Sequence, residues 1–257
     1  MKFLIIGDVI GRTGRNALKE FLPSIIEKEK PDFIIANGEN AAGGFGITKK
    51  VYNELLSLGI DVVTSGNHIW DKKEIVQFID QEERLLRPAN YPPSALGRGY
   101  GIYKKGNKKI AVINIMGRVF MGIPLDCPFR TFDVIYERIK DSSDYIVVDF
   151  HAEATSEKMA FGYYVDGKAD IVFGTHSHVP TADEQILPKG TAYITDVGLT
   201  GAVHSVIGMK VDQPIYKFLT GMPVKYEVAT GGYLFHGIIV EKNDEKTEIR
   251  RIKMKKE

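Results

Sequence analysis

The chain has 257 residues, which is enough for one large α/β domain or two small ones. Hydrophobic residues make up 44% of the sequence, charged residues make up 26%, and the formal net charge is +1. These values are ordinary for a globular protein and argue against a disordered chain, a membrane protein and a strongly basic nucleic-acid-binding protein. We therefore expect no membrane association and no stable nucleic-acid partner.

The N-terminal residues and the cysteine content bear on the cellular compartment. Residues 1–8, MKFLIIGD, reach glycine and aspartate too early to contain the apolar segment of a signal peptide. Cys127 is the single cysteine, so an intrachain disulfide is impossible, which is compatible with a reducing compartment. We expect a cytoplasmic protein.

Short apolar runs rich in β-branched residues alternate with longer amphipathic stretches, which predicts strands connected by helices. Two helices are expected near residues 15–30 and 49–58, and Thr48 is a plausible N-cap of the second. Strands are expected, in chain order, at 2–7, 32–36, 61–65, 109–115, 145–150 and 170–174.

From about residue 184 the pattern changes to hairpins. Residues 184–187 and 191–197 flank a Pro-Lys-Gly turn, and a second antiparallel pair, 232–242 and 247–253, is joined through 243–246. A purely parallel sheet would leave these hairpins unexplained, whereas two packed mixed sheets with outer helices accommodate all elements. Because no repeat or linker interrupts the pattern, we expect one domain over 1–257.

Residues of the types that bind metals occur directly after the predicted strands. They include four of the six histidines, and in chain order they are Asp8, Glu39, Asn40, Asn67, His68, His151, His176 and His178. Side chains at the carboxyl ends of neighbouring strands can converge on one crevice, where α/β proteins tend to bind ligands. We therefore expect these residues to form one site.

The chemistry of this set indicates a metal centre. Carboxylates, carboxamides and imidazoles are donors for divalent ions such as manganese, iron or zinc. One ion would not use them all, whereas two ions about 3.5–4 Å apart would use about seven or eight ligands. His176 and His178 alternate on a segment that we expect to be extended, so their side chains would face the same way and could each meet one ion.

Each residue also has a simpler interpretation. Asp8 could cap the following helix, Asn40 and Asn67 could occupy left-handed turns, and His151 could be a hydrogen-bonded buried histidine. These interpretations do not explain why all of the residues lie at strand ends. The glycines of the segment 7–14 also suggest a phosphate-binding loop, but their spacing departs from G-x-G-x-x-G, and we expect them to allow a tight turn beside Asp8.

Seven segments, in order along the chain, carry a resemblance to a known family. They are GDVIGRTGR, NGENAAGGFGIT, TSGNHIWDKKEI, LLRPANYP, VINIMGRVFM, VDFHAEATSEK and GTHSHVPTADEQILPKGTAYITDVGLTGAVHSVIGM. Together they resemble the YmdB-like metallophosphoesterases, bacterial 2′,3′-cyclic-nucleotide phosphodiesterases of the calcineurin-like superfamily, over roughly residues 1–210. The wider superfamily usually has D-x-H at the first motif, whereas Val9 and Ile10 follow Asp8 here.

The resemblance implies a four-layer αββα sandwich, with two mixed β-sheets flanked by helices, as a single metallophosphoesterase domain. It implies two divalent ions, iron or manganese, and assembly into a homo-oligomer. It assigns Glu39 as the bridging ligand and His68 as the catalytic acid. The ions would be held by Asp8, Glu39, Asn40 and His178, and by Glu39, Asn67, His151 and His176.

The resulting hypothesis is that 2′,3′-cyclic nucleotides are hydrolysed to 3′-nucleotides by a metal-bridging hydroxide, with His68 protonating the leaving oxygen. Three alternatives stay open: a phosphatase or phosphodiesterase of another substrate range, a nucleotide-binding regulatory metalloprotein with incidental turnover, and a dinucleotide-binding protein. Three further roles are also open. Asp196 could orient a ligand or form a turn, His204 could contact substrate, and Trp70 could stack on a base or pack in the core.

Overall fold

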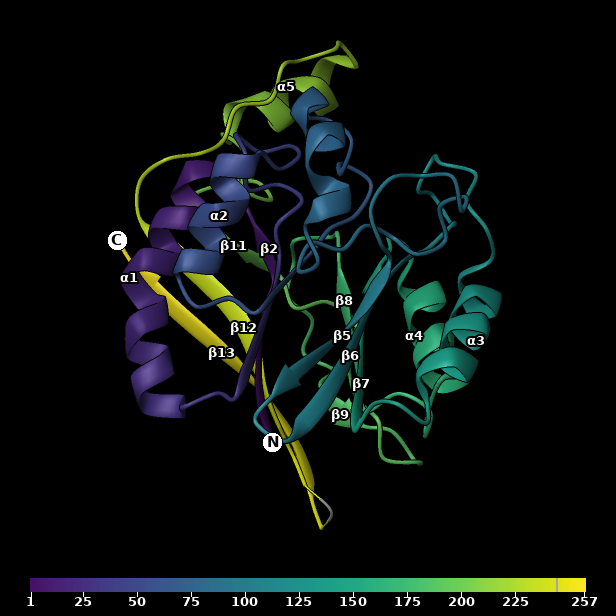
Figure 1. Ribbon diagram of the computed structural model, residues 1–257. Helices are drawn as coiled ribbons and strands as arrows, with labels where there is room; N and C mark the ends of the chain where they lie inside the picture. Colours follow the sequence, from purple (N-terminus) through teal and green to yellow (C-terminus); the bar gives the residue numbers. More distant parts are fainter. Residues whose placement is uncertain (244) are drawn as a thin grey trace.

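Alternating side chains of strand β1 (Lys2–Ile6) face two different hydrophobic cores. The computed structural model of this chain describes residues 1–243 and 245–257 (Figure 1). Phe3 and Ile5 pack between two stacked sheets, whereas Leu4 and Ile6 pack under the outer helices. Because successive side chains of a strand point to opposite faces, a strand that is apolar at both sets of positions must be covered on both faces.

The first sheet has five strands in the order β13-β12-β1-β3-β4. Strands β1, β3 and β4 are parallel, and β12 is antiparallel to both of its neighbours. Besides β1, this sheet contains β3 (Phe33–Asn37), β4 (Val62–Thr64), β12 (Tyr233–Lys242) and β13 (Thr247–Lys256). Its parallel strands are connected by α1 (Gly11–Glu29) and α2 (Lys49–Ser57).

The second sheet has six strands in the order β5-β6-β7-β8-β10-β9. Strands β6, β7, β8 and β10 are parallel, and the edge strands β5 and β9 are antiparallel to their neighbours. Its elements are β5 (Tyr100–Lys105), β6 (Lys108–Met116), α3 (Pro128–Ile139), β7 (Tyr145–His151), α4 (Thr155–Tyr164), β8 (Ile171–Thr175), β9 (Gln185–Ile186) and β10 (Ala192–Ile194).

The remaining elements connect the layers. A short parallel pair is formed by β2 (Asp8–Val9) and β11 (Leu199–Thr200), and two 3₁₀ turns, η1 (Lys73–Gln77) and η2 (Ile79–Gln81), follow β4. Helix α5 (Asp212–Thr220) lies apart from both helix layers, at the top of Figure 1. None of the helices in the described residues is both long enough and apolar enough to span a bilayer.

Three buried clusters separate the layers and establish the predicted four-layer αββα arrangement. One lies between the sheets and includes Phe33 and Phe173, both almost completely buried, and burying such a side chain contributes about 1.5–3 kcal/mol. The second lies under α1 and α2, and the third lies under α3 and α4 and includes Phe161. Figure 1 shows the two helix pairs on opposite outer sides of the stacked sheets.

The predicted strands and both hairpins are confirmed, and Thr48 caps α2 by accepting a hydrogen bond from the backbone N–H of Val51 (3.3 Å). Residue 244 of the predicted connection 243–246 lies outside the described residues. Helix α1 begins at Gly11, earlier than predicted. Gly14, which was expected to serve a tight turn, lies within this helix, and an added Cβ there would lie 2.4 Å from the carbonyl oxygen of Thr200, so glycine lets α1 approach β11.

Candidate metal centre

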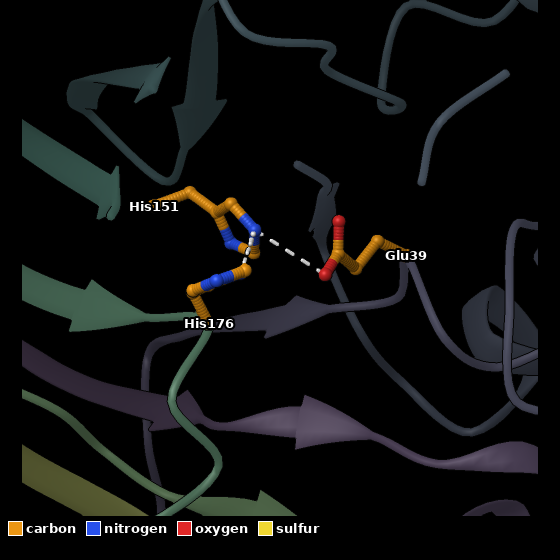
Figure 2. Close-up of side chains that lie close together, drawn as sticks. All are labelled: Glu39, His151 and His176. Carbon is orange, nitrogen blue, oxygen red and sulfur yellow. Dashed lines mark hydrogen bonds and ion pairs between the residues drawn. The ribbon is translucent and has the colours of Figure 1, made fainter. Parts of the chain in front are cut away.

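Two groups of potential ligands meet where four strands end. Asp8, Glu39 and His178 form one group, and Glu39, His151 and His176 form the other, with the ligand atoms of each group within 4.8 Å of one another. Figure 2 shows the side chains of Glu39, His151 and His176 pointing toward one another. Glu39 belongs to both groups, so its carboxylate lies where a ligand shared by two ions would have to lie.

The parallel strands explain this convergence. Asp8 follows β1, Glu39 follows β3, His151 is the last residue of β7, and His176 and His178 follow β8. These strands are parallel within each sheet, so their carboxyl ends meet at a common edge. The structure therefore brings together residues that the sequence placed at the strand ends, as the convergence argument predicted.

A hydrogen-bond relay determines which nitrogen of His151 faces the cluster. The Thr175 hydroxyl donates to Asp149 Oδ1 (2.6 Å), so it accepts from the His151 Nδ1–H (2.9 Å). The unprotonated Nε2 then lies 3.1 Å from His176 Nδ1 and 3.3 Å from Glu39 Oε1. Three acceptors that converge without a proton between them fit a bound cation.

The other two histidines are oriented in the same way. His178 Nδ1 donates to the backbone carbonyl of Ile207 (2.8 Å), which leaves Nε2 toward Asp8 Oδ1 at 3.7 Å. His176 Nε2 pairs with Glu153 Oε2 (3.1 Å), which leaves Nδ1 toward His151. Each histidine therefore has one nitrogen held by an acceptor and the other available as a ligand.

The electrostatics of the cluster also favour a cation. Burial and the charge of Asp196 raise the pKa of Asp8 to about 8, and burial and the charge of Asp8 raise the pKa of Glu39 well above its ordinary value. Asp8 Oδ1 is buried and has no hydrogen-bond partner among the described residues. A cation next to these carboxylates would offset the cost of ionising them in the interior.

The histidines have the protonation state that ligation requires. Burial, and after it the charge of His176, lowers the pKa of His151 well below its ordinary value. Burial and the charge of His178 lower the pKa of His176 to about 4, and burial also lowers the pKa of His178. Neutral imidazoles are the metal-binding form, so the donor set is ready for ions at neutral pH.

The two asparagines line the same cluster. Asn67 Oδ1 lies 2.8 Å from His151 Nε2, and Asn40 Nδ2 lies 3.1 Å from Glu39 Oε1 and 3.2 Å from His178 Nε2. Asn40 would ligate through its amide oxygen, which a half-turn of the amide group brings to the same position. Neither asparagine has a positive φ, so the left-handed-turn interpretation of both residues is wrong.

The backbone of His176 and His178 is left-handed rather than extended, with φ values of 98° and 65°. The explanation by strand alternation is therefore wrong, although the two side chains do converge. A buried ion pair supports this segment: Lys158 Nζ donates to Asp196 Oδ2 (2.6 Å) and to the Thr175 carbonyl (2.8 Å). Such contacts offset the roughly 1–3 kcal/mol that each unusual backbone conformation costs.

Asp196 therefore combines the two roles left open by the sequence. Its carboxylate accepts from the backbone N–H of Ser177 (3.2 Å), between the two histidines, and from that of Gly198 (2.9 Å) in the following turn.

Gly66 leaves space beside His151 and Glu39, because an added Cβ there would lie 2.2 Å from His151 Nε2 and 2.4 Å from Glu39 Oε2. The donor set and this space together fit divalent ions.

A cavity of about 350 Å³ opens beside the cluster. Glu39, His176 and His178 form its polar wall, and His68 lies at the same wall without belonging to either ligand group. The apolar part of the lining, called the apolar wall, consists of Phe45, Val206, Ile207, Met209, Pro214, Phe218 and Tyr226. The site can thus receive a ligand that has both a charged and an apolar part.

The comparisons with known proteins agree with this architecture. The family model described as "YmdB-like protein" matches residues 4–254. The chain belongs to the YmdB-like family.

Three relatives extend this YmdB-like assignment. The chain is 49% identical to a 2′,3′-cyclic-nucleotide 2′-phosphodiesterase of Bacillus subtilis over 95% of this chain and 92% of the relative. A structure of a hypothetical protein from Thermus thermophilus has a TM-score of 0.94 and 43% identity, with 100% of both chains covered. A structure described as a novel phosphatase from Mycoplasma pneumoniae has a TM-score of 0.91 and 38% identity, covering 98% of this chain and 93% of that one.

Asp8, Trp70 and His204 have defined contacts in this YmdB-like chain. Asp8 does not cap α1, because Ile10 is the N-cap residue and makes no side-chain cap bond. Trp70 packs edge-on against Tyr91, with ring centroids 5.9 Å apart, and does not line the cavity beside the cluster. His204 is exposed and pairs with Glu257 (3.1 Å), also away from that cavity.

The sequence did not predict the residues that hydrogen-bond to the candidate ligands of this YmdB-like chain or to their partners. Thr175 holds His151 and Glu153 holds His176, and Asp149 and Lys158 in turn hold Thr175. Two of them gave a local signal, because Asp149 and Lys158 are charged residues at positions that the strand and helix patterns bury. A buried charge in an apolar pattern points to a partner, and here the partners belong to the site.

Replacement of Thr175 by valine is expected to weaken divalent-metal binding about 10- to 100-fold, because His151 loses the acceptor that fixes its tautomer. Competition with a chelator measures the affinity. Thr13→Val is the matched control, since the buried Thr13 hydroxyl donates to the Ala229 carbonyl (2.8 Å), which is not part of either ligand group. Equal metal affinity in both variants would show that Thr175 does not orient His151 for binding.

Proposed function

We propose that this chain is a metal-dependent phosphoric diester hydrolase that converts 2′,3′-cyclic nucleotides to 3′-nucleotides. The observation that carries the proposal is the carboxylate of Glu39, shared by two ligand groups on the wall of a half-apolar cavity. The Bacillus subtilis relative, which is described by this reaction, supports the choice of substrate. The whole chain, 1–257, would act as one metallophosphoesterase domain.

Two divalent ions, iron or manganese, would be held by the two predicted ligand sets. Asp8, Asn40 and His178 would serve one ion and Asn67, His151 and His176 the other, with Glu39 common to both. Divalent ions at such a site supply an activated water as nucleophile and stabilise charge on the phosphoryl oxygens. The protein would contribute the neutral imidazoles and the buried carboxylates that hold the ions in place.

His68 would donate the proton to the leaving 2′ oxygen. Its backbone N–H donates to Glu39 Oε2 (3.2 Å), which ties its position to the shared ligand. Its Nδ1 pairs with Asp71 Oδ2 (2.9 Å), so Nε2 is the nitrogen available to a bound substrate. The Phe45 ring packs edge-on against the imidazole at 5.0 Å and limits its rotation.

The apolar wall of the cavity would receive the nucleobase. Phe45, Phe218 and Tyr226 present aromatic rings there, and aromatic rings bind bases of any sequence by stacking. Phe218 is 83% exposed on α5, so a stacked base would remove apolar surface of this ring from contact with water. This wall distinguishes a nucleotide from a small inorganic phosphoester.

Replacement of Phe218 by alanine is expected to raise KM for the cyclic nucleotide about 5- to 100-fold with little change in kcat, because stacking is worth about 1–3 kcal/mol per base. Steady-state kinetics measure both constants. Leu219→Ala is the control, because Leu219 is equally exposed on the same helix but does not line the cavity. An unchanged KM in Phe218→Ala would contradict base binding at this wall.

The decisive experiment is hydrolysis of 2′,3′-cyclic AMP by purified protein of known metal content, with separation of the 2′ and 3′ products. We expect 3′-AMP, loss of activity after chelation, and recovery with manganese or iron. Because the Mycoplasma pneumoniae structure is described as a phosphatase, the substrate panel also includes 3′-AMP as a monoester. No turnover despite two bound metals would point to another phosphoester or to a nucleotide-binding regulatory role.

Two features of the cellular context remain predictions from the sequence. One is a cytoplasmic location. The other is assembly into a homo-oligomer, and size-exclusion chromatography with light scattering would test this oligomeric state.

A further inference from the structure

A second cavity, of about 480 Å³, lies between helix α3 and residues 87–100. One face of α3 provides Arg130, Val134 and Arg138, which are spaced by four residues and therefore lie along one side of the helix. Helix α3 lies on the outer side of the second sheet (Figure 1). None of the predicted metal ligands lines this cavity, and neither does His68, so it is separate from the candidate metal centre.

Arg87 lines this cavity, the arginine pocket, from a buried position and forms no ion pair within the described residues, and Asp80, the carboxylate that acts on its charge, does not line the pocket. The Arg87 side chain is buried, and its three nitrogens donate to the carbonyl oxygens of Leu96 (2.8 Å), Pro88 (2.7 Å) and Ala95 (3.1 Å). Burial lowers the pKa of Arg87 from its ordinary value. Carbonyl oxygens orient the guanidinium but do not neutralise it, so a full positive charge lies under the pocket.

The rest of the lining increases this positive charge. Arg130 and Arg138 are exposed and form no ion pair with any residue in the described ranges 1–243 and 245–257. Asp126 is the only acidic residue of the lining, so three arginines against one aspartate leave two positive charges. A phosphate monoester is a dianion near neutral pH and would balance this charge, and guanidinium groups match phosphate geometry.

Two tyrosine rings supply the apolar part of the pocket. Tyr91 and Tyr100 are half-buried and line the wall next to Arg87. Aromatic rings next to arginines are the combination that binds a base together with its phosphate. The volume of the pocket lies within the range of sites for small organic ligands.

We propose that this arginine pocket is a second ligand site, which binds a mononucleotide through its phosphate monoester group. The proposal goes beyond the hydrolysis proposed above and does not depend on it, because the two sites share no lining residue. The phosphate would meet Arg130 and Arg138 at the mouth above Arg87, and the base would pack against the tyrosine rings.

Cys127, the single cysteine of the chain, lines the same pocket and reports its occupancy without interference from the metal centre. The experiment measures the rate at which iodoacetamide, an uncharged reagent, alkylates Cys127 in the metal-loaded full-length protein as 3′-AMP is added. We expect saturable protection, with about tenfold slower alkylation at about ten times the dissociation constant. Adenosine, which lacks the phosphate, is expected to protect far less.

Variants separate this site from a general effect of the nucleotide. The double change Arg130→Ala and Arg138→Ala is expected to remove the protection while leaving hydrolysis of the cyclic substrate unchanged. Arg12→Ala, at an exposed arginine on α1 over the other sheet, should retain full protection. Unchanged alkylation at about 10 mM 3′-AMP, enough to fill a site with a dissociation constant near 1 mM, would overturn the proposal. Equal protection in the double variant, or by adenosine, would also overturn it.

Discussion

Replacement of Glu39 by glutamine is expected to lower kcat/KM for cyclic-nucleotide hydrolysis at least about a thousandfold and to reduce the bound metal. Glu39 is the one carboxylate common to both ligand groups, and its amide isostere carries no charge to hold a cation. A divalent ion contributes several kcal/mol of transition-state stabilisation, and each 1.36 kcal/mol corresponds to about tenfold in rate. Metal analysis and steady-state kinetics on the same preparation measure both effects.

The stability of the metal-free protein distinguishes this role from a structural one. Burial and the charge of Asp8 make the ionised form of Glu39 unfavourable, so removing the charge should keep or raise the midpoint of thermal unfolding. Glu29→Gln is the matched control, because Glu29 is also buried but pairs with Arg250 on the outer side of the first sheet. If Glu39→Gln unfolds more easily than the native protein and keeps its metal, Glu39 is a structural residue.

The strand ends made the convergence of the candidate ligands predictable from the sequence. The residues after β1, β3, β4, β7 and β8 have the right chemistry, and parallel strands place such residues at one edge whatever the details of packing. The same reasoning gave the two mixed sheets, because the hairpins of the C-terminal part could not join a purely parallel sheet. Local sequence patterns were sufficient to predict the sheet type and the common edge, because both depend on strand direction alone.

The supporting residues depend on contacts between distant segments and were not predictable in this way. Asn37 donates to Asp149, 112 positions away (3.1 Å), and Ile207 accepts from His178 across the base of the cavity. The left-handed backbone of His176 and His178 likewise lies beside contacts from distant residues, because Lys158 donates to the Thr175 carbonyl and Asp196 accepts from the backbone N–H of Ser177. A sequence pattern contains no information about which buried charge will meet which distant loop.

Replacement of His68 by alanine is expected to lower kcat for 2′,3′-cyclic AMP about 100- to 10,000-fold, which is the range typical for a lost general acid. The metal content should stay unchanged. His68 lines the cavity beside Glu39 but is in neither ligand group. The matched control is His204→Ala, because His204 is a surface residue paired with Glu257, and this variant should retain full activity.

The leaving group provides the sharper test of this role. A 2′ alkoxide needs a proton to depart, whereas p-nitrophenolate leaves readily without one. His68→Ala should therefore hydrolyse a p-nitrophenyl phosphodiester with a loss below about tenfold, because the step assisted by the acid is no longer required. Equal losses on both substrates would mean that the His68 side chain supports the site, through its contacts with Asp71 and Phe45, rather than donating a proton, and loss of metal would make it a ligand.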